Sequence, residues 1–235
     1  MTDPDVTDEL QDATSRLVRT VDALTDEEYA AASLLPDWSR AHVVAHLALN
    51  AEALTGVLRG IVGGEPTTMY ASQEQRDADI EELAAADPSE LRDRLLGSTT
   101  DLADAMAAVP DEGWDTVVER TPGSGRTFVA HAVPGMRLRE VEIHHADLAA
   151  GYTRAEWPTS FSERVLRSMM KRDAGDEPFT AVPHDLAGTW QCGEVTDSSP
   201  VVRGSAADLA WWLTGRDDGE GLTTDSDALP RIEAW

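Results

Sequence analysis

Apolar residues recur every three or four positions through most of the first 150 residues, which predicts a series of amphipathic helices. Four of these helices are long, so the pattern predicts a four-helix bundle over residues 1–155. The expected helices cover residues 6–28, 39–60, 72–86, 88–109 and 134–151.

Residues at the expected helix ends sharpen this prediction. Ser39 is a good N-cap for the second helix. Asp87, Pro88 and Glu90 together predict a capping box at the start of the fourth helix. Gly151 is the expected C-cap of the last one. Between residues 110 and 134 we expect an irregular segment with a loop of roughly ten residues.

The pattern changes after Trp157-Pro158, where shorter strand-like runs appear. We expect a helix over 160–172, strands near 178–183, 188–195 and 199–203, and a helix from Ala206 to Arg216. The tail, residues 229–235, is expected to pair as an edge strand. The pattern therefore predicts a small α/β domain over residues 156–235 and an α+β fold class for the whole chain.

Composition narrows the choice of partners. The formal net charge is -25, from 44 acidic and 19 basic residues, so nucleic acid and anionic membranes are not expected partners. An anionic substrate would need specific arginines to overcome this background. The sequence has no apolar run long enough for a membrane span and no signal-peptide pattern. Its single cysteine, Cys192, is expected to be a buried, unreactive thiol. We therefore expect a cytoplasmic protein.

Glu140 and His144 are the first candidates for chemistry. They are four residues apart on an expected helix, which places both side chains on one face. Such a pair can bind one divalent metal, and His46 on another helix of the bundle is the best-placed third ligand. The ligand types favour zinc, and three protein ligands leave positions open for a reactant. The alternatives are a solvated ion pair and a structural histidine.

Neighbouring residues in the same helix have less defined roles. Asp147 could orient a metal-bound histidine through its other ring nitrogen. His145 could support the site from behind or be the ligand in place of His144. Glu142 is expected to point away from the pair into solvent.

Two arginines are candidates for binding an anionic substrate. Arg76 lies near the start of the third expected helix and Arg216 closes the last one. For Arg216 the alternative is stabilisation of the helix C-terminus. We found no nucleophile motif, phosphate loop or dinucleotide fingerprint, so any thiol chemistry would need a thiol from outside the chain.

The chain resembles a known family, the mycothiol-dependent maleylpyruvate isomerases of the DinB-like superfamily. The resemblance rests on four stretches that run in order over nearly the whole chain. These stretches are residues 35–48 (LPDWSRAHVVAHLA), 69–81 with Met69-Tyr70 and Arg76, 137–148 (RLREVEIHHADL) and 208–216 (DLAWWLTGR).

The resemblance implies a DinB-like helical bundle followed by a domain similar to sterol-carrier folds. It also implies a divalent metal, usually zinc, held by His46, Glu140 and His144, with Arg216 and Arg76 near the substrate. The reaction that it implies is cis–trans isomerisation of maleylpyruvate to fumarylpyruvate in gentisate breakdown. A metal-activated thiolate of mycothiol, or of another low-molecular-weight thiol, would add to the double bond, allow rotation, and leave again.

Two other hypotheses stay open. Relatives with the same metal ligands include thiol S-transferases, which would conjugate an electrophile and need Arg216 little. The third hypothesis is a non-enzymatic binding module, for which turnover and bound metal are not expected. The partners expected under the first hypothesis are a dicarboxylic ketoacid and a thiol.

Overall fold

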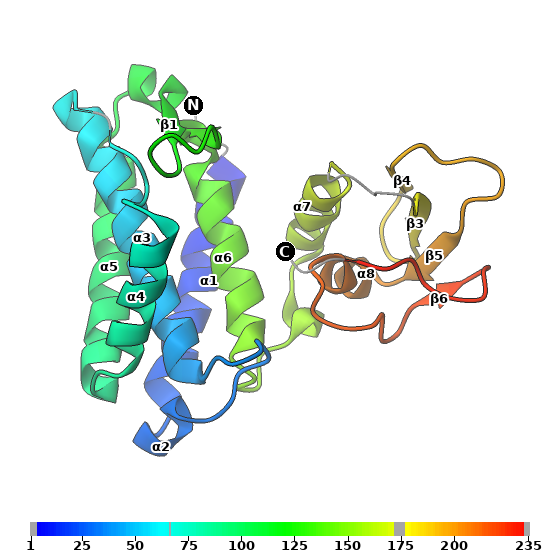
Figure 1. Cartoon of the computed structure of the whole chain (residues 1–235), viewed down its shortest axis with the longest axis horizontal. Coiled ribbons are helices and arrows are strands. Elements are labelled where there is room, and N and C mark those ends of the chain that lie inside the picture. The colour runs from blue at the N-terminus through cyan, green and yellow to red at the C-terminus, as the bar shows by residue number, and fades with distance from the viewer. Residues whose placement is uncertain (1–3, 66, 172–176, 233–235) are drawn as a thin grey trace. The chain divides into compact units, whose positions relative to one another are not determined.

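The chain forms two compact units in a computed structural model that describes residues 4–65, 67–171 and 177–232 (Figure 1). The first unit comprises Met1–Gly151 and the second comprises Tyr152–Trp235. The division lies close to the predicted boundary after residue 155, and the assignment of the two parts as domains stays a prediction.

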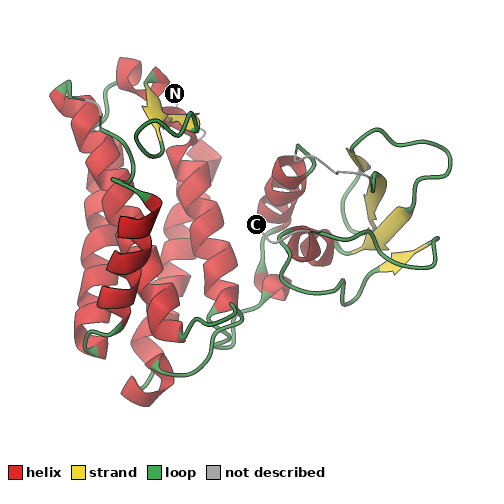
Figure 2. Ribbon diagram, in the orientation of Figure 1, coloured by secondary structure: helices red, strands yellow, loops and turns green. Residues whose placement is uncertain are grey.

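Four long helices form the first unit, as the apolar pattern predicts (Figure 2). Helix α3 packs against α5, and α1 packs against α6. The short helix α4 lies along α3. The bounds are α1 Pro4–Ala23, α2 Asp26–Tyr29, α3 Arg40–Gly63, α4 Gln73–Ala84, α5 Pro88–Ala108 and α6 Val133–Asp147.

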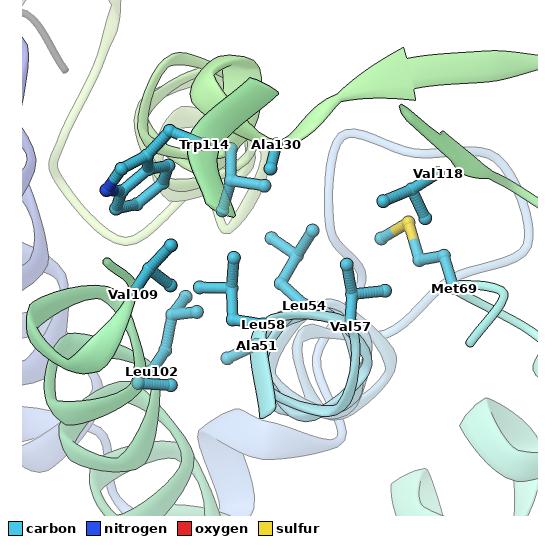
Figure 3. Close-up of a cluster of buried hydrophobic side chains, with 12 residues drawn as sticks. Ala51, Leu54, Val57, Leu58, Met69, Leu102, Val109, Trp114, Val118 and Ala130 are labelled. Carbon is cyan, nitrogen blue, oxygen red and sulfur yellow. The ribbon is translucent and has the colours of Figure 1, made fainter. Parts of the chain in front are cut away.

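One cluster of buried apolar side chains fills the end of the bundle where α3 and α5 meet the segment after α5 (Figure 3). Leu54 and Leu58 of α3 face Leu102 of α5, and Trp114 closes the cluster from the 3₁₀-helix Asp111–Asp115. Burial of side chains of this size stabilises the fold by about 1.5–3 kcal/mol each. The helix α3, which carries His46, is therefore held rigidly.

The observed helix starts agree with the predicted ones, whereas the predicted capping hydrogen bonds are only partly present. Ser39 caps α3 as predicted, since its Oγ accepts a hydrogen bond from the backbone N–H of His42. The predicted capping box of α5 is wrong. Asp87 precedes Pro88 at the expected position, but its side chain makes no capping hydrogen bond. Because Pro88 has no N–H, this helix start has fewer donors to satisfy.

The end of α6 also differs from the prediction. The helix ends at Asp147 with Leu148 as C-cap, so Gly151 is not its cap. The loop before α3 covers this end: the N–H of Leu34 donates to the Asp147 carbonyl, 2.8 Å away, and Arg40 Nε donates to the Leu148 carbonyl. An arginine at the carbonyl end also suits the helix dipole.

A two-stranded antiparallel hairpin lies where an irregular segment is expected. Strand β1 (Val117–Glu119) pairs with β2 (Thr127–Val129), and a 3₁₀-turn, Ala130–Ala132, leads into α6. The strands are three residues long, which is too short for a periodic signal. Met69 and Tyr70 extend this structure, because their N–H groups donate to the carbonyls of Glu119 and Arg120.

The second unit combines two helices with a small sheet. Strand β3 (Phe179–Pro183) pairs in parallel with β5 (Val201–Gly204) and antiparallel with β4 (Trp190–Cys192). The strand order is β4-β3-β5-β6, with β6 at Thr223–Thr224. Helices α7 (Thr159–Met169) and α8 (Ala206–Leu213) pack against each other, and a 3₁₀-turn, Arg154–Glu156, precedes α7.

Two expectations for this unit are wrong. Residues 229–232 form no strand; β6 takes the edge position instead, and residues 233–235 lie outside the described part. Helix α8 ends at Leu213, before Thr214 and Gly215, rather than at Arg216. Residue 172, the expected end of α7, is also outside the described residues. The predicted class, α+β with a helical bundle and a smaller mixed part, is confirmed.

Helix α3 is long and apolar enough to cross a membrane by length and composition alone, with a mean hydropathy of 1.2 over its best window. In the structure, 72% of that window is buried inside the protein, as is common for a core helix.

Candidate metal centre

Three ligand-type side chains from two helices meet in the first unit. His46 Nε2 of α3 lies 2.9 Å from Glu140 Oε2 of α6, and His144 Nε2 lies 3.3 Å from the same oxygen. One ligand atom from each residue lies within 4.8 Å of the others. Both histidines are buried, and the Glu140 side chain is 18% exposed. The three residues singled out by spacing are thus adjacent in space.

Asp147 fixes the orientation of His144. Its Oδ2 lies 2.8 Å from His144 Nδ1, and its side chain is fully buried. With Nδ1–H donating to Asp147, the free electron pair of a neutral ring is on Nε2, which faces Glu140 and His46. This is the usual arrangement for a metal-binding histidine with a supporting carboxylate.

Arg76 of α4 holds the ring of His46 from the other side. Its Nη2 lies 3.2 Å from His46 Nδ1. Because a guanidinium can only donate, Nδ1 is the acceptor, and the neutral ring carries its proton on Nε2, facing Glu140. Trp38 covers the same imidazole, with ring centroids 5.7 Å apart.

The charges of the cluster follow from burial and these contacts. Burial lowers the pKa of His46 to about 4, so this ring is neutral at pH 7. Burial also acts to lower the pKa of His144, but its hydrogen bonds to Asp147 and Glu140 outweigh that effect and raise the pKa. For Glu140, burial acts to raise the pKa, and the hydrogen bonds from both histidines bring it well below its ordinary value.

Two neighbours do not join the cluster. His145 is buried and its Nε2 lies 2.7 Å from Thr20 Oγ1 of α1, so it faces another helix. Glu142 is not solvated as expected, because α1 packs over this face of α6 and Arg16 Nη2 donates to Glu142 Oε1 at 2.8 Å. Only the packing of α1 reveals this burial.

Two arginines lie beside the ring of Tyr70, and one of them, Arg76, contacts His46. The Arg76 guanidinium carbon is 5.8 Å from the centroid of the Tyr70 ring, and that of Arg120 is 5.7 Å from it. Tyr70 and Arg76 also line a cavity of about 210 Å³ together with Leu49, Ala53, Met69, Ala71, Gln75 and Asp79. The sequence singled out Arg76 and Met69-Tyr70 but gave no signal for Arg120.

Arg216 belongs to the second unit and follows α8. Its Nη1 donates to the Thr214 carbonyl at 3.1 Å, at the C-terminal end of that helix. This contact is the one that the helix-stabilising alternative expects, and the role of Arg216 toward a substrate stays a prediction. Cys192 is buried, as predicted.

Fold and site together define a class: a helical bundle that carries a candidate His/Glu/His metal centre, joined to a small mixed part. The sequence profile of the mycothiol maleylpyruvate isomerase N-terminal domain matches residues 10–149. The chain therefore belongs to the mycothiol maleylpyruvate isomerase family, as the sequence motifs predict.

Similar solved structures extend over both units. The crystal structure of the mycothiol-dependent maleylpyruvate isomerase is 27% identical, with a TM-score of 0.90, covering 99% of this chain and 96% of that one. A mutant of that isomerase, at 26% identity, gives the same TM-score and coverage. YfiT from Bacillus subtilis, described as a probable metal-dependent hydrolase with an unusual four-helix bundle topology, is 16% identical. Its TM-score is 0.52, it covers 68% of this chain and 86% of its own, and it supports the fold alone. None of the curated protein sequences matches this chain.

Proposed function

We propose that this protein is a metal- and thiol-dependent isomerase that converts maleylpyruvate to fumarylpyruvate, a step of gentisate breakdown. The observation that carries the proposal is the His46/Glu140/His144 cluster in a chain that matches a mycothiol-dependent isomerase over 99% of its length. The chain has no motif that supplies a nucleophile of its own, and Cys192 is buried. A thiol from outside is therefore the reactive group.

The residues present fit a divalent metal. Two imidazole nitrogens and one carboxylate are ligand types that zinc prefers, and the Asp147–His144 hydrogen bond supplies the supporting contact such sites use. His46, Glu140 and His144 would hold the ion. When bound, it lowers the pKa of a thiol, so that thiolate is present at neutral pH.

Arg76 is proposed to bind a carboxylate of the substrate. A ring that binds a metal through Nε2 carries its proton on Nδ1, so His46 can then no longer accept the hydrogen bond from Arg76. Arg76 is thereby released for another acceptor beside the centre. A guanidinium in this place also stabilises negative charge that develops on the substrate while its double bond is opened.

Arg216 is proposed as a second arginine for the substrate. The Arg216→Ala variant is expected to lose turnover while its metal content stays normal, because the residue is not a ligand. Full activity in that variant would show that Arg216 only stabilises the C-terminal end of α8. The variant Arg203→Ala, at an exposed position of β5, is the matched control.

The test of the function is ultraviolet absorbance of maleylpyruvate with purified, zinc-loaded protein, with and without mycothiol. We expect conversion that requires the thiol and that is lost in Glu140→Gln, but not in the exposed control Glu82→Gln. Conversion without any thiol would contradict the mechanism. Bound metal without conversion would contradict the substrate and favour transfer of the thiol to another electrophile.

A further inference from the structure

Two arginines from separate elements lie beside the ring of Tyr70, and one of them, Arg76, also contacts the candidate ligand His46. Arg76 comes from α4, and Arg120 directly follows β1. Like charges gathered in this way are unfavourable unless an anion joins them.

Tyr70 organises these two arginines. Its ring lies within 6 Å of both the Arg76 and the Arg120 guanidinium carbon, at 5.8 and 5.7 Å. The backbone fixes this contact, because the Tyr70 N–H donates to the Arg120 carbonyl at 2.9 Å. Both guanidinium groups are therefore held beside one aromatic ring, at the edge of the hairpin.

The carboxylates near Arg76 and Arg120 are exposed or have other hydrogen-bond partners. Asp77 pairs with Arg76, but its side chain is 56% exposed, and such pairs contribute little. Glu119 instead accepts a hydrogen bond from the N–H of Gly125. Glu140 is shared with two histidines. In addition, Arg76 Nε is buried without a hydrogen-bond partner in the part of the chain that the structure describes.

The positive charge of these two arginines contrasts with the charge of the whole chain. The chain as a whole has a formal charge of -25, yet Arg76 and Arg120 both lie at the Tyr70 ring. A site that binds a doubly charged organic acid in an acidic protein needs such a local reversal of potential.

We propose that Arg120, together with Arg76, binds one carboxylate of the diacid substrate, with the Tyr70 ring positioning both guanidinium groups. This inference rests on the proposed function and adds Arg120 as a residue that determines specificity for diacids. Its charge selects a dianion over a neutral electrophile, so that Arg120 affects substrate binding more than the chemical step.

Steady-state kinetics of Arg120→Gln on maleylpyruvate test this role. We expect KM to rise about 10- to 100-fold, the effect of losing a charged hydrogen-bond partner, with kcat changed by less than about 3-fold. Zinc content should stay normal. Arg120→Lys should restore part of the lost substrate affinity, since lysine keeps the positive charge but lacks the paired N–H donors of a guanidinium. The control is Arg126→Gln, an exposed arginine of the same hairpin. A KM equal to that of the control would overturn the inference.

A binding measurement separates this inference from the proposed function. Calorimetric titration of the zinc-loaded protein with maleate, a cis dicarboxylate, needs no turnover. We expect maleate to bind the wild type at least about 10-fold more tightly than Arg120→Gln, and crotonate, a monocarboxylate, to show a smaller difference. Equal maleate affinities would reject the Arg120 site even if isomerisation is observed. A difference without isomerisation would keep the anion site and reject the reaction.

Discussion

Asp147 determines which nitrogen of His144 faces the other two candidate ligands. Replacing it with asparagine keeps the shape but removes the charge that holds Nδ1–H in place. We expect Asp147→Asn to weaken zinc binding by about 10- to 100-fold, the usual effect of losing such a supporting carboxylate. Competition with a chromophoric chelator measures this affinity, with the exposed Asp93→Asn as control. An unchanged affinity would mean that Asp147 only supports the helix end.

Arg76 competes with a metal for His46. Its hydrogen bond to Nδ1 requires the tautomer that cannot bind a metal through Nε2, and its positive charge opposes the ion. Arg76→Gln is therefore expected to bind zinc about 3- to 10-fold more tightly, even though it should turn over substrate poorly. The same chelator competition, with Arg126→Gln as control, decides the point. Weaker zinc binding in Arg76→Gln would contradict this description of the tautomer.

Single residues differ in how far the sequence could predict them. The Glu140–His144 pair follows from helical spacing, and His46 follows as the best-placed ligand on another helix of the bundle. Arg76 was a candidate from its residue type, and the resemblance gave it a place near the substrate. Arg120 could not be found in this way, because its contact with Tyr70 depends on how the hairpin meets the segment before α4. Glu142 was misjudged for the same kind of reason, since α1 buries a charge that looks solvated in its own helix.

At the scale of elements, helix starts were predictable and helix ends were less so. Ser39, Ser72 and Pro88 mark the starts of α3, α4 and α5 through local hydrogen bonds or a fixed backbone angle. The end of α6 depends instead on Leu34 and Arg40, which come from a distant part of the chain. The short strands were missed in the first unit because tertiary contacts, not periodicity, define them.

The cap of α3 gives a prediction at this scale. Ser39 Oγ accepts from the His42 N–H, and the Ser39 N–H donates to His42 Nδ1. We expect Ser39→Ala to lower the free energy of unfolding by about 1 kcal/mol, because the first turn loses its acceptor. Urea unfolding measures the change. Ser15→Ala is the control, since that hydroxyl only binds the Gln11 carbonyl within α1. An equal, small effect in both variants would show that the cap contributes nothing.

For the whole molecule, Tyr29 links α2 to the rest of the bundle and should make stability depend on alkaline pH. Its hydroxyl donates to the Val21 carbonyl, and burial raises its pKa from 10.0 to about 12. The neutral phenol is thus favoured in the folded state. Its contribution is complete below pH 10, where both states are protonated, and is lost as the pH rises toward 12.

The phenylalanine variant isolates this effect. Between pH 10 and pH 12, the free energy of unfolding of the wild type should fall more steeply than that of Tyr29→Phe. Chemical denaturation at several pH values provides the comparison. Parallel curves for the two proteins would show that Tyr29 ionises in the folded state as easily as in the unfolded one.

The central claim concerns the whole molecule with both of its reactants: the thiol acts as a catalyst and is returned. Proton NMR of a reaction that contains zinc-loaded protein, maleylpyruvate and mycothiol tests it most directly. We predict that the cis-alkene signals are replaced by trans-alkene signals of fumarylpyruvate, while the amount of free mycothiol stays constant. Consumption of mycothiol in step with the substrate, with a stable thioether as product, would contradict the isomerase and identify a thiol transferase.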